Sequence, residues 1–153
     1  MASAIESQIQ PSPFPAPSKT TSAVLSGRDT DITSISFADR ILLIVSQTGS
    51  LAHWVHVPLA ASTDPLNSGR LDSHDADNAL LPLPHLTATT VLGGTKPDVE
   101  VLGQTLATTI ASAILVKQPN EERTLVMGLG LVDVANIRKE AFDELIGAIL
   151  DLL

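Results

Sequence analysis

The sequence contains no cysteine and no tyrosine, and aromatic residues make up only 3% of its 153 residues. Without cysteine the chain has no disulfide, no thiolate nucleophile and no thiolate metal ligand, which fits a reducing compartment. It also lacks a G-x-S-x-G nucleophile elbow, an H-E-x-x-H metal motif and a P-loop. These absences argue against an enzyme, and the sequence predicts neither a cofactor nor a metal.

Basic residues are also few: nine Lys and Arg stand against seventeen Asp and Glu, which gives a net charge of -8. They are spread along the chain, whereas proteins that bind nucleic acids gather basic side chains against the phosphates. The sequence therefore predicts no nucleic-acid partner. The acidic excess either steers the protein toward a basic protein surface or simply keeps it in solution.

Long apolar runs are missing too. The most apolar stretch, 99–116, is interrupted by Glu100, Gly103 and Gln104 and is shorter than the roughly 20 residues that a bilayer requires. The first ten residues have neither a basic start nor a continuous apolar stretch, unlike a secretory signal. We therefore expect no membrane partner and a cytoplasmic protein.

Proline is concentrated near the N-terminus, where four prolines alternate with other residues between Gln10 and Ser18. This spacing favours extended backbone and prevents both helices and central strands. We expect residues 1–18 to be a disordered Pro-rich arm, with a ligand for an SH3-like module as the alternative. Residues 19–153 have the length of a single domain.

The strongest structural signal is the run Ile41 to Val45, five consecutive apolar residues rich in β-branched side chains. Such a run indicates a strand that is covered on both faces of its sheet. Turn signals flank it, including Gly49, for which we expect a positive φ. The pattern predicts an opening antiparallel meander of four strands and two later strands, at 20–25, 31–37, 41–45, 51–57, 85–92 and 123–132. The last is apolar on both faces, so we expect it to be central, with Gly128 and Gly130 allowing close packing.

Two helices follow from apolar residues that recur every three or four positions. The first begins near Thr95–Asp98, which resembles a capping box, and its stripe runs from Val99 to Ile114. The second carries a stripe from Ile137 to Leu152, and Asp133 or Asn136 is the predicted cap. The fold class is α+β, with a six-stranded, mainly antiparallel sheet, two helices on one face and the order ββββ-(loop)-βαβα.

Between the fourth and fifth strands, residues 59–84 are rich in proline and aspartate. Long irregular segments inside a domain are usually functional or disordered. We expect a flexible acidic loop, which is either a solvated insertion or an electrostatic contact with another protein. The candidate contact residues are Asp64, Asp72, Asp75 and Asp77.

Two helices suffice for one face of the sheet, yet apolar side chains point to both faces. Leu42 and Ile44 alternate with Ile41, Leu43 and Val45. An apolar face of this kind usually binds a partner, so we infer a dimer of stacked sheets. Its predicted interface residues are Leu42, Ile44, Trp54 and His56. His53 and His56 are three apart on a strand and point to opposite faces, which argues against a shared metal.

Three segments together resemble one known family. They read F-x-x-x-I-L-L-I-V-x-Q-x-G from Phe37, then T-x-x-L-G-G-x-x-P before a helix with V-x-x-L-G-x-x-L, and R-T-L-V-M-G-L-G-L-V-D from Arg123. In order and spacing the set resembles proteasome assembly chaperone 3, from about Asp31 to the C-terminus. The acidic loop is longer than usual in that family, and the Pro-rich arm is absent from its shorter animal members.

The resemblance implies a non-catalytic assembly chaperone without a cofactor. It implies pairing with a proteasome assembly chaperone 4-like subunit and binding to α-type proteasome subunits while the α-ring is built. It also implies a cytoplasmic location with the nucleus as a second compartment, and leaves open a homodimer when the related subunit is missing. A longin- or roadblock-like scaffold module and a degenerate hydrolase are the alternatives.

Overall fold

The computed structural model describes residues 15–60 and 83–153, which form one mixed sheet with two helices. The strands are β1 (Ser18–Leu25), β2 (Arg28–Ser36), β3 (Arg40–Ser46), β4 (His53–Pro58), β5 (Thr89–Leu92) and β6 (Thr124–Gly130). The helices are α1 (Pro97–Lys117), the short 3-10 helix η2 (Val134–Asn136) and α2 (Lys139–Leu152). The predicted α+β class and element order are confirmed. Of the predicted Pro-rich arm (residues 1–18), residues 1–14 lie outside the described residues. β1 begins at Ser18.

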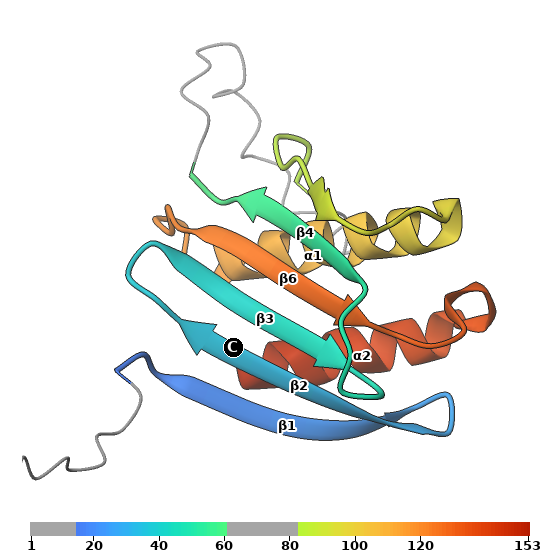
Figure 1. Cartoon of the computed structure of the whole chain (residues 1–153). Helices are drawn as coiled ribbons and strands as arrows, with labels where there is room; N and C mark the ends of the chain where they lie inside the picture. Colours follow the sequence, from blue (N-terminus) through green and yellow to red (C-terminus); the bar gives the residue numbers. More distant parts are fainter. Residues whose placement is uncertain (1–14, 61–82) are drawn as a thin grey trace, which may run out of the picture.

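The strand order is β1-β2-β3-β6-β4-β5 (Figure 1). β6 lies between β3 and β4, parallel to the former and antiparallel to the latter, and the remaining pairs are antiparallel. The predicted four-stranded meander is therefore wrong at its last step, whereas the central place of the sixth strand is confirmed. β3 and β6 are the most apolar strands, and side by side they can both be buried at the centre.

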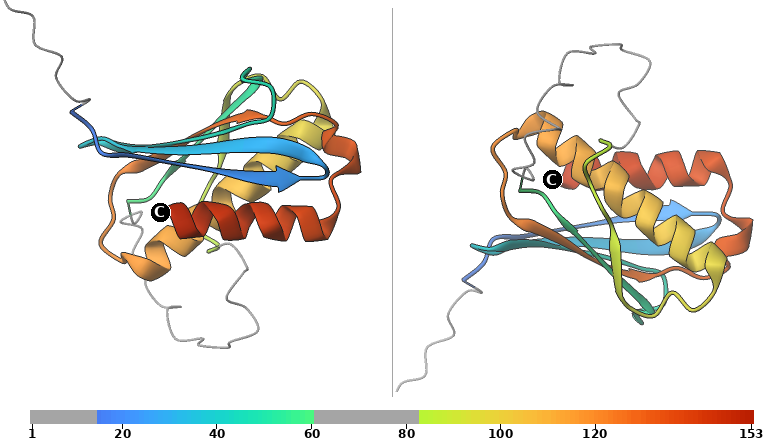
Figure 2. Two further views of the ribbon diagram at one scale, coloured as in Figure 1. Left: turned by 90° about the horizontal axis from the view of Figure 1, so that it is seen from below. Right: turned by 90° about the horizontal axis from the view of Figure 1, so that it is seen from above.

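Both helices lie on the same side of the sheet (Figure 2). Alternate strand residues point toward them and are fully buried, among them Ile32, Leu43, Val45, Leu125 and Met127. α1 contributes Leu106 and Ile110 to this core, and α2 contributes Leu145 and Ile149. By length and composition alone α1 could also cross a membrane, but its apolar stripe packs on the sheet as that of a core helix does.

The helix starts differ from the prediction. α1 has Lys96 at its N-cap and α2 has Arg138, and neither residue accepts a hydrogen bond from the first turn with its side chain. The predicted capping box at Thr95 and the predicted caps at Asp133 and Asn136 are therefore wrong. Asp133 instead adopts a left-handed conformation at the start of η2, a turn that separates the strand from the helix. Gly49 has the expected positive φ.

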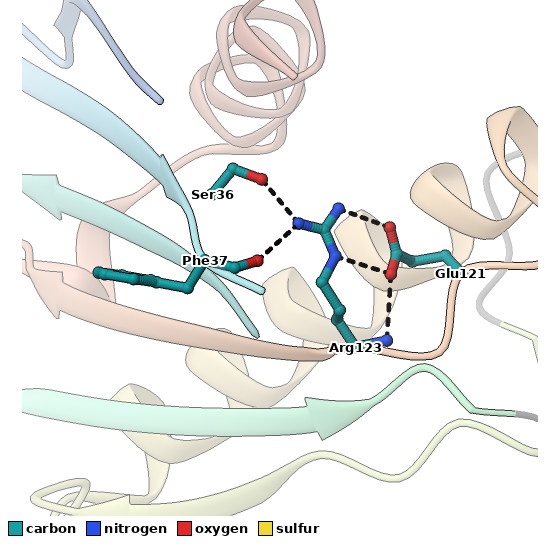
Figure 3. Close-up of polar contacts among 4 residues, drawn as sticks. All are labelled: Ser36, Phe37, Glu121 and Arg123. Atoms are coloured by element: carbon teal, nitrogen blue, oxygen red, sulfur yellow. Dashed lines mark hydrogen bonds and ion pairs between the residues drawn. The ribbon is translucent and has the colours of Figure 1, made fainter. Parts of the chain in front are cut away.

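Arg123, just before β6, forms an ion pair with Glu121 and hydrogen-bonds to the end of β2 (Figure 3). Arg123 donates to both carboxylate oxygens of Glu121, at 2.8 and 2.7 Å, and also to the Ser36 hydroxyl and the Phe37 carbonyl. The Arg123 amide donates to the same carboxylate at 3.0 Å. These hydrogen bonds, chiefly those from the Arg123 side chain, hold the pKa of Glu121 at about 2, well below its ordinary 4.5. The pair therefore fastens two strands that are not neighbours in the sheet.

Replacing Arg123 with methionine should destabilise the domain by about 2 kcal/mol at neutral pH, because the 8%-exposed Glu121 side chain loses its cation. Since folding lowers the pKa of Glu121, the stabilisation is complete above about pH 4.5 and disappears as the pH falls through about 2. Urea unfolding of both proteins between pH 7 and pH 2 measures this difference. The matched control is Arg40→Met. The ion pair between Arg40 and Asp39 is exposed, so its loss should leave the unfolding transition unchanged. A pH-independent difference would contradict the assignment.

Candidate protein-interaction face

The side of the sheet away from the helices faces the viewer in Figure 1. Its residues form a broad apolar surface. We call it the open face. Its central side chains are half-buried, whereas their neighbours along each strand are buried beneath the helices. Leu42 and Ile44 thus point opposite to Leu43 and Val45, as the alternation predicts. Exposed apolar patches usually mark interaction sites, so we expect a partner on this face.

The strand registers arrange the open face in two rows that cross the sheet. One row contains Thr33, Ile44, Gly128, Trp54 and Leu92. The other contains Ile35, Leu42, Val126, His56 and Thr89. Directly opposed residues on neighbouring strands are close enough for their side chains to pack. The two rows therefore form one continuous surface from β2 to β5.

Trp54 lies at the middle of this surface, over a glycine of the neighbouring strand. A Cβ atom added to Gly128 would lie only 3.0 Å from two ring carbons of the Trp54 indole. The missing side chain thus lets the indole rest on the sheet. Glycine at position 128 therefore allows close packing, as the sequence predicts. The same arrangement places a large aromatic side chain at the centre of the open face. Aromatic side chains in such places often dominate binding energy.

The open face becomes polar toward β1. Ser22 donates a hydrogen bond to Asp31 at 2.7 Å, and the hydroxyls of Thr20 and Thr33 are 3.2 Å apart. An apolar centre with a polar margin is the usual anatomy of a protein–protein interface.

The structure brings the four predicted interface residues, Leu42, Ile44, Trp54 and His56, onto this one face. It adds Ile35, Val126 and Leu92, of which Leu92 is 66% exposed. Alternation along the second strand indicates Ile35, but Val126 and Leu92 join the patch only through the pairing of β6 and β5 with β4. That these residues contact a partner stays a prediction.

His53 points to the opposite face of β4 from His56, as their spacing predicts, and the structure buries it there. Its Nε2 lies 3.1 Å from the Thr90 hydroxyl, and its buried Nδ1 has no partner. A Cβ atom on Gly94 or Gly103 would come within 2.7 Å of the ring, so these glycines leave the space that the imidazole fills. Burial lowers the pKa of His53, against the opposing effect of Glu100, and keeps the ring neutral at physiological pH. His53 is therefore a packing residue of the core.

Within residues 15–60 and 83–153, no three acidic or histidine side chains come together as metal ligands. The predicted contact residues Asp64, Asp72, Asp75 and Asp77 lie outside the described residues. The described chain before that loop ends at Ala60, next to the buried Leu59. It resumes at Leu83, whose amide donates to the Ser112 hydroxyl at 2.8 Å.

Comparison with known proteins gives a result at the level of the fold. The sequence matches no protein-family model and no curated protein at a significant level. Its structure resembles a chain of a solved chaperone complex for yeast 20S proteasome assembly, with a TM-score of 0.52. The two chains are 17% identical, and the match covers 88% of this chain and 97% of the other. The described domain thus has the fold of a chain from a proteasome assembly chaperone complex.

Proposed function

We propose that this protein is a non-catalytic chaperone for proteasome assembly, which dimerises with a related subunit and binds α-type proteasome subunits during α-ring assembly. One observation carries the proposal. A domain with the fold of a chain from such a chaperone complex leaves a continuous apolar sheet face uncovered by its own helices. A catalytic site would require converging polar groups, whereas this face offers packing surface for another protein.

The partner that best fits the open face is a second sheet of the same fold. Two sheets that stack face to face bury the inner side chains of both in one layer about 10 Å thick. Leu42, Ile44 and Trp54 would form the centre of this layer, and His56 would lie beside them. We propose a proteasome assembly chaperone 4-like subunit as this partner, and a homodimer when that subunit is missing.

For the client we propose a contact through the acidic loop, in the cytoplasm and also in the nucleus. Exposed charge pairs are each worth about 0–1 kcal/mol and raise the rate of encounter more than the lifetime of a complex. Such contacts suit a chaperone that must release its client.

Replacing Asp64, Asp72, Asp75 and Asp77 by asparagine should leave subunit pairing and thermal stability nearly unchanged. Association with the α-type subunit should become slower and less sensitive to salt, because screened charges no longer steer the approach. Stopped-flow measurements at several ionic strengths compare the two proteins. Unaltered association rates at low salt would mean that the loop is only a solvated insertion.

The proposed function is tested by isolating the tagged full-length chain from cells and identifying the bound proteins by mass spectrometry. We expect α-type proteasome subunits and one related small subunit. The Ile44→Asp variant should lose the related subunit, which separates specific binding from background. Recovery of membrane-associated GTPases in place of proteasome subunits would instead favour a longin- or roadblock-like scaffold.

A further inference from the structure

A second apolar surface lies on the helix side of the domain, away from the open face. It is a shallow groove of about 480 Å³ between the first turns of α1, the η2 turn and the start of α2. The N-terminal ends of both long helices lie at this end of the domain (Figure 1). We call it the helix groove. Its apolar lining residues are Pro97, Val101, Leu102, Val134, Ile137 and Phe142.

The groove is accessible in the isolated domain. Val101 is 63% exposed, although it lies on a helix whose other apolar residues largely pack on the sheet. Phe142 and Leu102 are half-buried in the groove lining. An exposed valine beside an accessible aromatic ring offers packing surface for apolar side chains from outside. Because the groove and the open face lie on opposite sides of the domain, a partner on one leaves the other free.

The charges around the groove favour an acidic occupant. Arg138 and Lys139 line it, and within the described part of the chain neither side chain makes a hydrogen bond or an ion pair. Of the lining residues that the structure describes, only Asp98 is acidic. The first turns of α1 and α2 also carry Asp98, Glu100 and Glu140, which offset the partial positive charge of the helix starts. The positive charge at the groove therefore comes from the side chains of Arg138 and Lys139. The charged lining residues that the structure describes, Arg138, Lys139 and Asp98, sum to +1 in a chain of net charge -8.

A second copy of this chain is a poor occupant. In a two-fold dimer the same patch lies opposite itself, so Arg138 and Lys139 of the two copies would approach each other. Like charges placed together across an interface oppose association. The charges therefore point to a different protein.

We propose that the helix groove binds a segment of a partner protein in which large apolar side chains alternate with Asp or Glu. The apolar side chains would pack against Val101 and Phe142, and the carboxylates would pair with Arg138 and Lys139. Grooves between helices commonly take amphipathic segments in this way. This inference does not depend on the proposed role in proteasome assembly.

The probe is a capped synthetic peptide of Leu, Phe and Glu, titrated into the ¹⁵N-labelled full-length chain. The expected amide shifts centre on Val101, Thr105, Val134 and Phe142. A matched peptide with Lys in place of Glu should bind at least about tenfold more weakly, because its charges repel the rim. Equal binding of the two peptides, or shifts centred on Trp54, would overturn the proposal, as would the absence of shifts at millimolar peptide.

Variants locate the site. Val101→Asp, and Arg138→Glu combined with Lys139→Glu, should each weaken binding of the acidic peptide at least about tenfold. The reversals place acidic residues at a helix start, where they are compatible with folding. The matched control is Val116→Asp on the same helix, since Val116 is 72% exposed and does not line the groove. Equal losses in control and test variants would contradict the site. If the acidic peptide binds only after residues 64–80 are replaced by a Gly/Ser linker, those residues of the chain itself fill the groove.

Discussion

Leu43→Asp should yield no folded protein, whereas Ile44→Asp should yield a folded domain that no longer pairs through its sheet. The two residues are neighbours on β3 but point to opposite faces, and Leu43 is completely buried beneath the helices. An unpaired carboxylate there costs about 4–5 kcal/mol or more, much of the roughly 5–15 kcal/mol that stabilises a typical domain. At Ile44 water solvates the carboxylate in the monomer, and the cost appears only when a partner covers the open face.

Circular dichroism and urea unfolding measure the folding of each variant, and sedimentation measures its pairing. Leu42→Asp gives a second test on the same face as Ile44, and should behave as Ile44→Asp does. If substitutions on both faces unfold the protein, the open face belongs to the core of the domain. If both leave an intact dimer, the partner binds elsewhere and the stacked-sheet account is wrong.

Trp54→Ala should weaken pairing by about 2–4 kcal/mol, or roughly 30- to 1,000-fold, because central aromatic residues dominate many interfaces. Trp54 rests on Gly128 near the centre of the open face, so a stacked sheet would bury its indole completely. The domain itself should keep its fold, since the core faces the helices and Trp54 does not contribute to it.

Isothermal titration with the related subunit measures this loss. Val116→Ala is the control, because it truncates an apolar side chain of α1 that is 72% exposed and does not lie on the open face, and it should not alter the affinity. Trp54 is the only tryptophan of the chain, so its emission in the wild-type protein should shift to shorter wavelength as a partner without tryptophan is added. Unchanged affinity for Trp54→Ala would place the interface outside the open face.

Local patterns in the sequence predict much of this fold. Alternation along 41–45 separates Leu42 and Ile44 from the buried Leu43, and the same rule places His53 and His56 on opposite faces. The recurrence of apolar residues gives both helices. The sequence also predicts the open face, because it contains only two helices, and two helices on one side leave the other side of the sheet uncovered. These features depend only on residues close together in the chain.

What the sequence does not predict depends on contacts between distant segments. β6 inserts between β3 and β4 because strand pairing is decided by packing across the sheet, which local alternation does not record. Val126 and Leu92 join the open face only through this pairing. The helix starts at Lys96 and Arg138 likewise differ from the motif-based expectation, because the loops before them are set by where the strands end. The Glu121–Arg123 pair joins β6 to Ser36 and Phe37, more than 80 positions away.

The central claim is that the open face pairs with a related subunit to make a chaperone for α-type proteasome subunits. Its most direct test is the native mass of the complex that forms when the full-length chain is co-expressed with a related chaperone subunit and an α-type subunit. The account predicts a complex with one copy of each, and for Ile44→Asp a mass that lacks the related subunit. A wild-type chain that stays monomeric under these conditions, or a complex that forms equally well with Ile44→Asp, would contradict it.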